Sequence, residues 1–319
     1  MMTMTAFLGA IESGTIYAIL ALGIFLSFRT LNMPDLTVDG SIVTGMAASA
    51  VICTAGGNPF ISLIGAALAG AVAGLATGIL HTKLKIQAIL AGILVMLASY
   101  SINLRIMGKT PNVPLTQTDT IYDQAEKIFP REYAGIILGV IILAAVIFLL
   151  YMFLRTRLGF VFRATGDNED MVRAAGVSGD SMKVMGFAIS NGFVGLAGGM
   201  LAQNQGFADI NSGTGMMVIG LASVILGEVV FGSKGLLRRL VAAVQSNNIG
   251  SSLSGNGIQR SQTGVGSDRS RRSLSGTAGR KGSKDKEKEA SEWKSCCKFI
   301  TSPRFSERAR SMKKSPLKI

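Results

Sequence analysis

Long stretches of this sequence carry no Asp, Glu, Lys or Arg, and they limit what the chain can fold into. Such stretches cover residues 40–80, 86–104, 134–154, 184–208 and 210–227. A helix that crosses a bilayer needs roughly 20 mainly apolar residues. Each stretch is therefore long enough for about one crossing, and the first is long enough for two.

Two further features complete the count of spans. Residues 56–59 read Gly-Gly-Asn-Pro and predict a turn between the two crossings of the first stretch. Residues 5–28 predict another span, and they differ from a cleavable signal peptide in lacking a basic start and in their length. The sequence thus predicts an all-α, polytopic transmembrane helix bundle with about seven spans before residue 233. An eighth span, expected after Arg239, is lost or replaced.

The basicity of the chain lies almost wholly in its last quarter. The mean hydropathy is +0.42 although the formal net charge is +13. Residues 1–244 hold 15 Lys/Arg and 13 Asp/Glu, a net charge of +2, whereas residues 245–319 hold 17 and 6, a net charge of +11. We therefore expect a transmembrane domain over residues 1–244. The Ser-, Gly- and Lys/Arg-rich remainder predicts a disordered, basic low-complexity tail suited to binding anionic lipid.

The loops predict an orientation. One set of alternate loops holds most of the basic residues: Arg29, Lys83, Lys85, Arg155, Arg157, Arg163, Arg173, Lys183, Lys234, Arg238 and Arg239. The positive-inside rule places this set in the cytoplasm. The loop over residues 155–183 is then cytoplasmic, and the N-terminus lies outside.

The segment between the first two spans is unusually polar and contains Asn32, Pro34, Asp35 and Asp39. Broken backbone at membrane depth survives only where protein or a water-filled cavity satisfies it, and transporters place such breaks on the substrate path. These four residues are our candidates for that path. The alternative is a plain cytoplasmic turn in which Asp39 caps the next helix.

The loop over residues 155–183 is long, and loops of that length are usually functional or disordered. Asp167 or Asn168 is suited to cap a short helix over residues 169–175, and Gly176 is suited to end it. A polar, exposed helix of this kind suits docking to a soluble partner; the alternative is a solvated connector.

Glycines recur at helical spacing in two spans. They are Gly70, Gly74 and Gly78, and later Gly195 and Gly199. Small residues let membrane helices approach closely, so ordinary helix packing is the favoured interpretation over a translocation seam.

Signatures of enzymatic chemistry are absent from the sequence. It has no GxxxxGK[ST] phosphate loop, no metal-ligand spacing among its three Cys, and no visible nucleophile–base pair. We expect a chain that is not an enzyme, holds no metal or other cofactor and has no nucleic-acid partner.

Residues 14–45 and 156–206 resemble the permease subunits of ATP-binding-cassette importers of the branched-chain amino-acid type, most closely those linked to aromatic amino acids. The resemblance covers about residues 5–244. It implies a permease that couples ATPase closure to alternating access for a small solute, an amino acid of the branched-chain or aromatic kind. The location it implies is the inner (plasma) membrane of a prokaryote.

The resemblance also implies partners and site residues. The partners are ATPase subunits that carry ATP and Mg, an extracytoplasmic solute-binding protein, a second permease subunit (identical or homologous) and membrane lipid. The family's ATPase-coupling helix falls on Gly166, Asp167, Asn168, Glu169, Met171, Arg173, Ala174, Gly176 and Val177. Two alternatives stay open: a sugar or nucleoside permease of this architecture, and a non-transporting membrane protein whose basic tail binds anionic lipid or partners.

Family members would continue into hydrophobic spans where this chain has its tail. The tail therefore has a second interpretation, as sequence translated out of frame. When codons allowed for residues 260–271 are read one base later, they can encode an apolar sequence suited to the start of a membrane helix. When codons allowed from Trp293 onward are read two bases later, they can encode a sequence that resembles the N-terminal opening of the partner ATPase.

Overall fold

The charge-free stretches form the long helices of the computed structural model, which describes residues 4–116, 118–127, 130 and 133–231. Five helical segments are long and apolar enough to cross a membrane. They are helix α1 (Met4–Ile24) with its π-helical continuation η1 (Phe25–Thr30), α3 (Pro59–Lys83), α4 (Ala88–Ile106), α6 (Ala134–Arg155) and α9 (Gly179–Gln205). The predicted tail over residues 245–319 lies outside the described residues.

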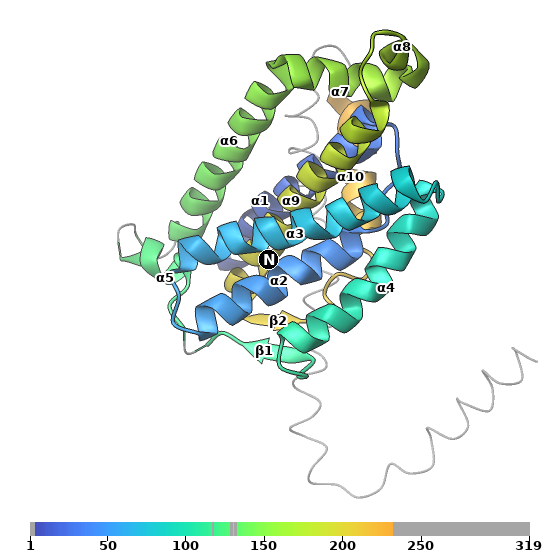
Figure 1. The fold of residues 1–319 in the computed structure, drawn as a ribbon. Coiled ribbons are helices and arrows are strands. Elements are labelled where there is room, and N and C mark those ends of the chain that lie inside the picture. Colours follow the sequence, from blue (N-terminus) through green and yellow to red (C-terminus); the bar gives the residue numbers. More distant parts are fainter. Residues whose placement is uncertain (1–3, 117, 128–129, 131–132, 232–319) are drawn as a thin grey trace, which may run out of the picture. The chain divides into compact units, whose positions relative to one another are not determined.

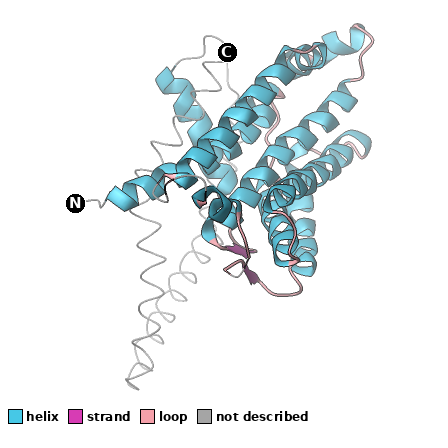
Figure 2. Cartoon of the chain, turned by 90° about the vertical axis from the view of Figure 1, so that its left-hand side faces the viewer, coloured by secondary structure: helices cyan, strands magenta, loops and turns pink. Residues whose placement is uncertain are grey.

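Two apolar helices are shorter, namely α2 (Val38–Thr54) and α10 (Met216–Phe231). The all-helical membrane bundle is therefore confirmed in the described part of the chain, with five helices of spanning length. The finer count of seven spans stays a prediction, because it requires α2 and α10 to cross as well. One small departure from an all-α fold is an antiparallel ribbon of β1 (Asn112–Pro114) and β2 (Phe207–Asp209), drawn in magenta in Figure 2.

Helix α9 lies at the centre of the arrangement. It contacts α1, α2 and α3 along its length and α7 and α8 near its start, as Figure 1 lets the reader follow. All five of the predicted packing glycines lie where α9 meets α3. A Cβ on Gly78 would come within 2.8 Å of Val184 Cα, and one on Gly199 within 2.7 Å of Ala66 Cβ. The absence of side chains therefore allows the two backbones to pack closely.

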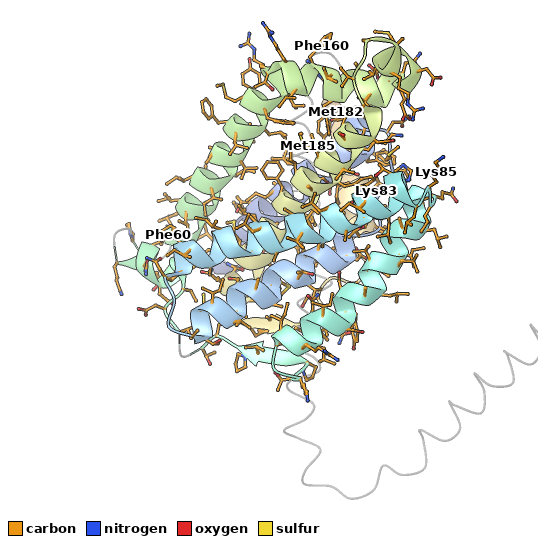
Figure 3. The ribbon with its side chains drawn as sticks, in the orientation of Figure 1. Phe60, Lys83, Lys85, Phe160, Met182 and Met185 are labelled. Carbon is orange, nitrogen blue, oxygen red and sulfur yellow. The ribbon has the colours of Figure 1, made fainter. Side chains whose placement is uncertain are left out.

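The loops that the sequence assigns to opposite sides lie at opposite ends of the bundle. At one end, Gly166 packs against the carbonyl of Thr30 and Gly78 packs against Val184. At the other end, Asn204 donates to Glu12 at 2.5 Å. Figure 3 shows Phe60 and Lys83 at the two ends of α3, with Lys85 just beyond Lys83.

Three short helices lie outside the long ones: α5 (Ile121–Glu126), α7 (Arg157–Asp167) and α8 (Glu169–Ala174). Helix α8 was expected, and the Asn168 side chain caps it by accepting from the Met171 amide at 3.2 Å. Gly176 follows α8 at φ +81°, a left-handed conformation that glycine adopts without strain. Helix α7 was not expected; the Thr156 hydroxyl caps its start by accepting from the Gly159 amide at 3.2 Å.

Candidate functional site

The expected coupling residues lie on the last turn of α7, on α8 and just beyond it. Gly166 packs against the carbonyl of Thr30 and against Leu31, so α7 touches the end of η1. Phe162 is fully buried and makes an edge-on contact with Phe153 at 5.9 Å between ring centroids. Helix α7 is thus anchored to the bundle, and it carries α8 at its end.

Glu169 holds α8 to the start of α9. Its Oε2 accepts from Lys183 Nζ at 2.6 Å, and its Oε1 accepts from Arg173 Nη2 at 3.1 Å. The hydrogen bond from Lys183 is the main cause that lowers the pKa of Glu169 below its ordinary value. Lys183 is buried, and its charge is compensated by this carboxylate. The ion pair therefore fixes the position of α8 relative to α9.

The outer surface of α8 is exposed. Met171 is 66% exposed although it is apolar, while the next residue, Val172, is buried. Arg173 is exposed too, and it lies 3.9 Å from Asp180. An exposed apolar residue flanked by charges on a helix that is itself held rigidly suits contact with another protein.

The segment from Leu31 to Thr37, here called the 31–37 segment, is folded into the bundle. Thr37 Oγ1 lies 2.7 Å from Thr77 Oγ1 of α3. Thr77 is six residues before Lys83 (the end of α3), a distance of about 9 Å along a helix axis. Leu31, Asp35 and Thr37 are buried, so this segment is not a plain solvated turn.

Asp35 is occupied by bonds within the protein. Its Oδ1 accepts from the Thr37 amide at 2.9 Å, and its Oδ2 accepts from Asn191 Nδ2 of α9 at 2.6 Å. Asn191 also donates to the Phe187 carbonyl at 3.0 Å, and its Oδ1 has no hydrogen-bond partner among the described residues. Asp35 thus ties the 31–37 segment to the middle of α9.

Asp39 caps a helix, but a different one from the helix that the sequence suggests. It is the second residue of α2, and its carboxylate accepts from the amides of Gly215 at 3.0 Å and Met217 at 2.7 Å. It therefore satisfies the Gly215 amide just before α10 and the Met217 amide in its first turn. Of the other two path candidates, Asn32 is exposed, in a left-handed conformation at φ 55°, and Pro34 is partly exposed.

Sequence reasoning missed a polar cluster at the opposite end of α9. Gln203 is buried; its Nε2 donates to Ser62 Oγ at 2.8 Å and to Ser49 Oγ at 3.1 Å. Its Oε1 accepts from the Ile121 amide at 2.9 Å, which joins α5 to the bundle. Its neighbour Asn204 bonds Glu12 of α1. The signal available in the sequence was two adjacent amides at the end of an apolar helix.

The described residues hold no group of three or more His, Cys, Asp or Glu side chains able to bind a metal ion. Within the same part of the chain, Cys53 is a buried free thiol.

Comparisons with known proteins bear on the same region. The family model described as "branched-chain amino acid transport system / permease component" matches residues 6–263. A "tyrosine transport system permease protein" of Clostridioides difficile is 40% identical over 228 residues, which is 72% of this chain and 75% of that protein. The "uncharacterized protein RP368" of Rickettsia prowazekii is 33% identical over 231 residues, 72% of this chain and 79% of the relative.

A more distant relative has a different printed role. The "autoinducer 2 import system permease protein LsrC" of Salmonella paratyphi B is 28% identical over 226 residues, 68% of this chain and 61% of that protein. No solved structure matches the chain.

Proposed function

The chain belongs to the family of permease components of branched-chain amino acid transport systems, and from that premise we propose that it carries an amino acid across the membrane. It is a multi-pass permease subunit of a prokaryotic ATP-binding-cassette importer, and such subunits carry no cofactor and do not hydrolyse ATP themselves. The substrate class that we propose is aromatic, with branched-chain amino acids next. The observation that carries this choice is the 40% identity to a tyrosine transport permease over three quarters of its length.

For the membrane topology, we propose that α2 and α10 cross together with the five long helices. The N-terminus is then outside, and α7 and α8 lie in the cytoplasm. The support is the distribution of basic residues, because Arg155, Arg157, Arg173 and Lys183 all belong to the end of the bundle that carries α7 and α8. The second permease subunit, the ATPases and the external binding protein complete the importer.

For coupling, we propose that the residues from Gly166 to Val177 dock with the ATPase. Helix α8 is exposed on its Met171 side and held to α9 through Glu169, so a push on its outer surface reaches the bundle. Alternating access needs an element of this kind whose two positions the ATPase selects.

For the substrate path, we propose that it borders the 31–37 segment. The accessible members of the candidate set are Asn32 and Pro34, whereas both carboxylates are engaged with neighbouring helices. A break in the helical backbone between η1 and α2 leaves carbonyl and amide groups that a polar solute can approach.

The docking proposal is tested with two variants of α8 and one control. Met171→Asp and Arg173→Glu place negative charge on its outer surface, whereas Arg157→Glu makes the same kind of change on exposed residue 157 of α7. Each full-length variant is purified with the partner ATPase, and the retained ATPase is quantified. We expect loss of ATPase from both α8 variants and its retention by Arg157→Glu. Retention by all three would refute docking at α8.

A sugar or nucleoside is the second candidate substrate class, and the similarity to a permease of an autoinducer 2 import system favours considering a solute other than an amino acid. Uptake of labelled tyrosine, leucine, ribose and uridine, each measured separately, distinguishes the two. Uptake of tyrosine or leucine supports the amino-acid assignment, and uptake of ribose or uridine alone would replace it.

A further inference from the structure

Helix α9 is hydrogen-bonded to α8 and to the 31–37 segment at two positions along its axis. Lys183, in its second turn, bonds Glu169 of α8 at 2.6 Å. Asn191, eight residues later, bonds Asp35 of the 31–37 segment at 2.6 Å. Eight residues correspond to roughly 12 Å along the helix axis. The element proposed to meet the ATPase and the segment proposed to border the path are thus fastened to the same helix.

The portion of α9 between these bonds is built to move as one piece. The helix is continuous from Gly179 to Gln205 and contains no proline. Phe187, between the two bonds, is fully buried. On the α3 side, glycine at position 74 lets the backbones meet beside Phe187 and Asn191. Packed interfaces of this density shift between discrete positions rather than bend continuously.

The 31–37 segment connects α9 to other helices of the bundle. Beyond Asp35, the chain bonds α3 through Thr37 and then enters α2, where Asp39 caps α10. A displacement of the segment is therefore transmitted through α2 and Asp39 to the start of α10. The 31–37 segment is bonded to α9 through Asp35, and α2, which begins just after the segment, is bonded to the start of α10 through Asp39.

Resting on the proposed function, we propose that Lys183 and Asn191 are positioning residues that make α9 a lever, so that movement of α8 displaces the 31–37 segment and α10. Asp35 acts through its bond to Asn191 and does not bind the solute. Both of its oxygens are already used, Oδ1 by the Thr37 amide and Oδ2 by Asn191, and the side chain is buried. Because the carboxylate is buried, a solute could reach it only by displacing the groups packed around it.

The test replaces Asn191 by Leu, a side chain of similar size that cannot donate to Asp35. The matched control is Ser190→Ala, which removes a buried 2.7 Å hydrogen bond from the adjacent residue of α9 to the Gly23 carbonyl of α1. Both variants remove buried hydrogen bonding from α9, two bonds in Asn191→Leu and one in Ser190→Ala, but only Asn191→Leu disconnects the segment. The full importer is reconstituted, and ATP hydrolysed per solute imported is measured.

We expect Asn191→Leu to raise this ratio about tenfold, a typical size for an allosteric coupling, with the ATPase still bound. Ser190→Ala is expected to keep the wild-type ratio. The exchange variant Asp35→Asn/Asn191→Asp keeps an amide–carboxylate pair and is expected to restore coupling. The exchange variant also keeps the proposal testable if Asn191→Leu fails to fold. A wild-type ratio in Asn191→Leu, an equal rise in Ser190→Ala, or an exchange variant that folds but stays uncoupled would overturn the lever.

A second measurement follows the movement itself. Spin labels are placed at the exposed residues Ser178, which joins α8 to α9, and Asn32, and each distance to a third label on exposed residue Phe60 is measured with and without ATP. In the wild type both labels move on ATP binding, whereas in Asn191→Leu only the label at Ser178 moves. If the wild-type importer takes up no solute, the proposed function fails. If it does and Asn32 still moves in Asn191→Leu, the lever alone fails.

Discussion

The close contact between α3 and α9 is tested by substituting two glycines of α9 that lie three residues apart. A Cβ on Gly195 would overlap the carbonyl of Ala66 and lie 2.9 Å from Gly70 Cα. A Cβ on Gly192 would meet its nearest neighbours, Ala67 O and Ala71 Cβ, at 3.5 Å. The first substitution collides with backbone, and the second fills ordinary contact space.

The magnitude follows from this difference. Carbon atoms pack best at about 3.5–4.0 Å, so Gly195→Ala must push α3 and α9 apart by about 0.6–1.1 Å. Overpacking of this kind costs about 1–3 kcal/mol. Both variants gain the same helix propensity of about 1 kcal/mol, which cancels between them. Gly195→Ala should therefore be less stable than Gly192→Ala by about 1–3 kcal/mol.

The assay is thermal unfolding of the two purified variants in one detergent. A stability gap of this size corresponds to roughly 2–12 °C in Tm for a chain of this length. Gly192→Ala is expected to match or exceed the wild type. A Gly195→Ala protein as stable as Gly192→Ala would refute the close backbone packing of α3 and α9.

Three further predictions concern other parts of the chain. Gln203→Leu strands the Ile121 amide and should cost about 1–3 kcal/mol of stability, whereas Gln205→Leu, at an exposed position of the same helix, should cost almost nothing by thermal unfolding. Because the pKa of Glu169 is lowered from 4.5, its ion pairs should hold α8 in place above that pH and release it as the pH falls through the lower pKa of the folded state. Protection of the α8 amides against hydrogen exchange, compared above and below pH 4.5, measures this release. Protection that stays the same on acidification would contradict it. The out-of-frame interpretation of the tail predicts specific codons for residues 260–271 and from Trp293 onward, and sequencing the coding DNA tests both.

The long helices were predictable because their signal is compositional. A charge-free stretch such as residues 134–154 becomes α6 almost residue for residue. Helix α8 was predictable for a local reason, since Asn168 and Gly176 punctuate it within a few residues of chain. Helix α7 was missed because residues 157–167 mix Arg, Gly and Phe, a pattern that resembles a loop until Thr156 is recognised as its cap.

The candidate site was only half predictable, because its decisive bonds join distant parts of the chain. The polarity of Asp35 and Asp39 marked the stretch between the first two predicted spans as unusual. Their partners lie 156 and more than 170 residues away, on α9 and at the start of α10. Nothing in the local sequence distinguishes a carboxylate that binds solute from one that fastens two helices. Asn191 and Lys183 were missed for the same reason.

We infer that this chain provides the membrane path of an ATP-driven amino-acid importer. The most direct measurement is uptake of labelled tyrosine into vesicles that contain the full chain with its ATPase and binding protein, with ATP supplied on the ATPase side. We expect accumulation that needs ATP, needs the binding protein and is abolished by Arg173→Glu. Tyrosine and leucine uptake that is absent, or that proceeds equally without ATP, would contradict it.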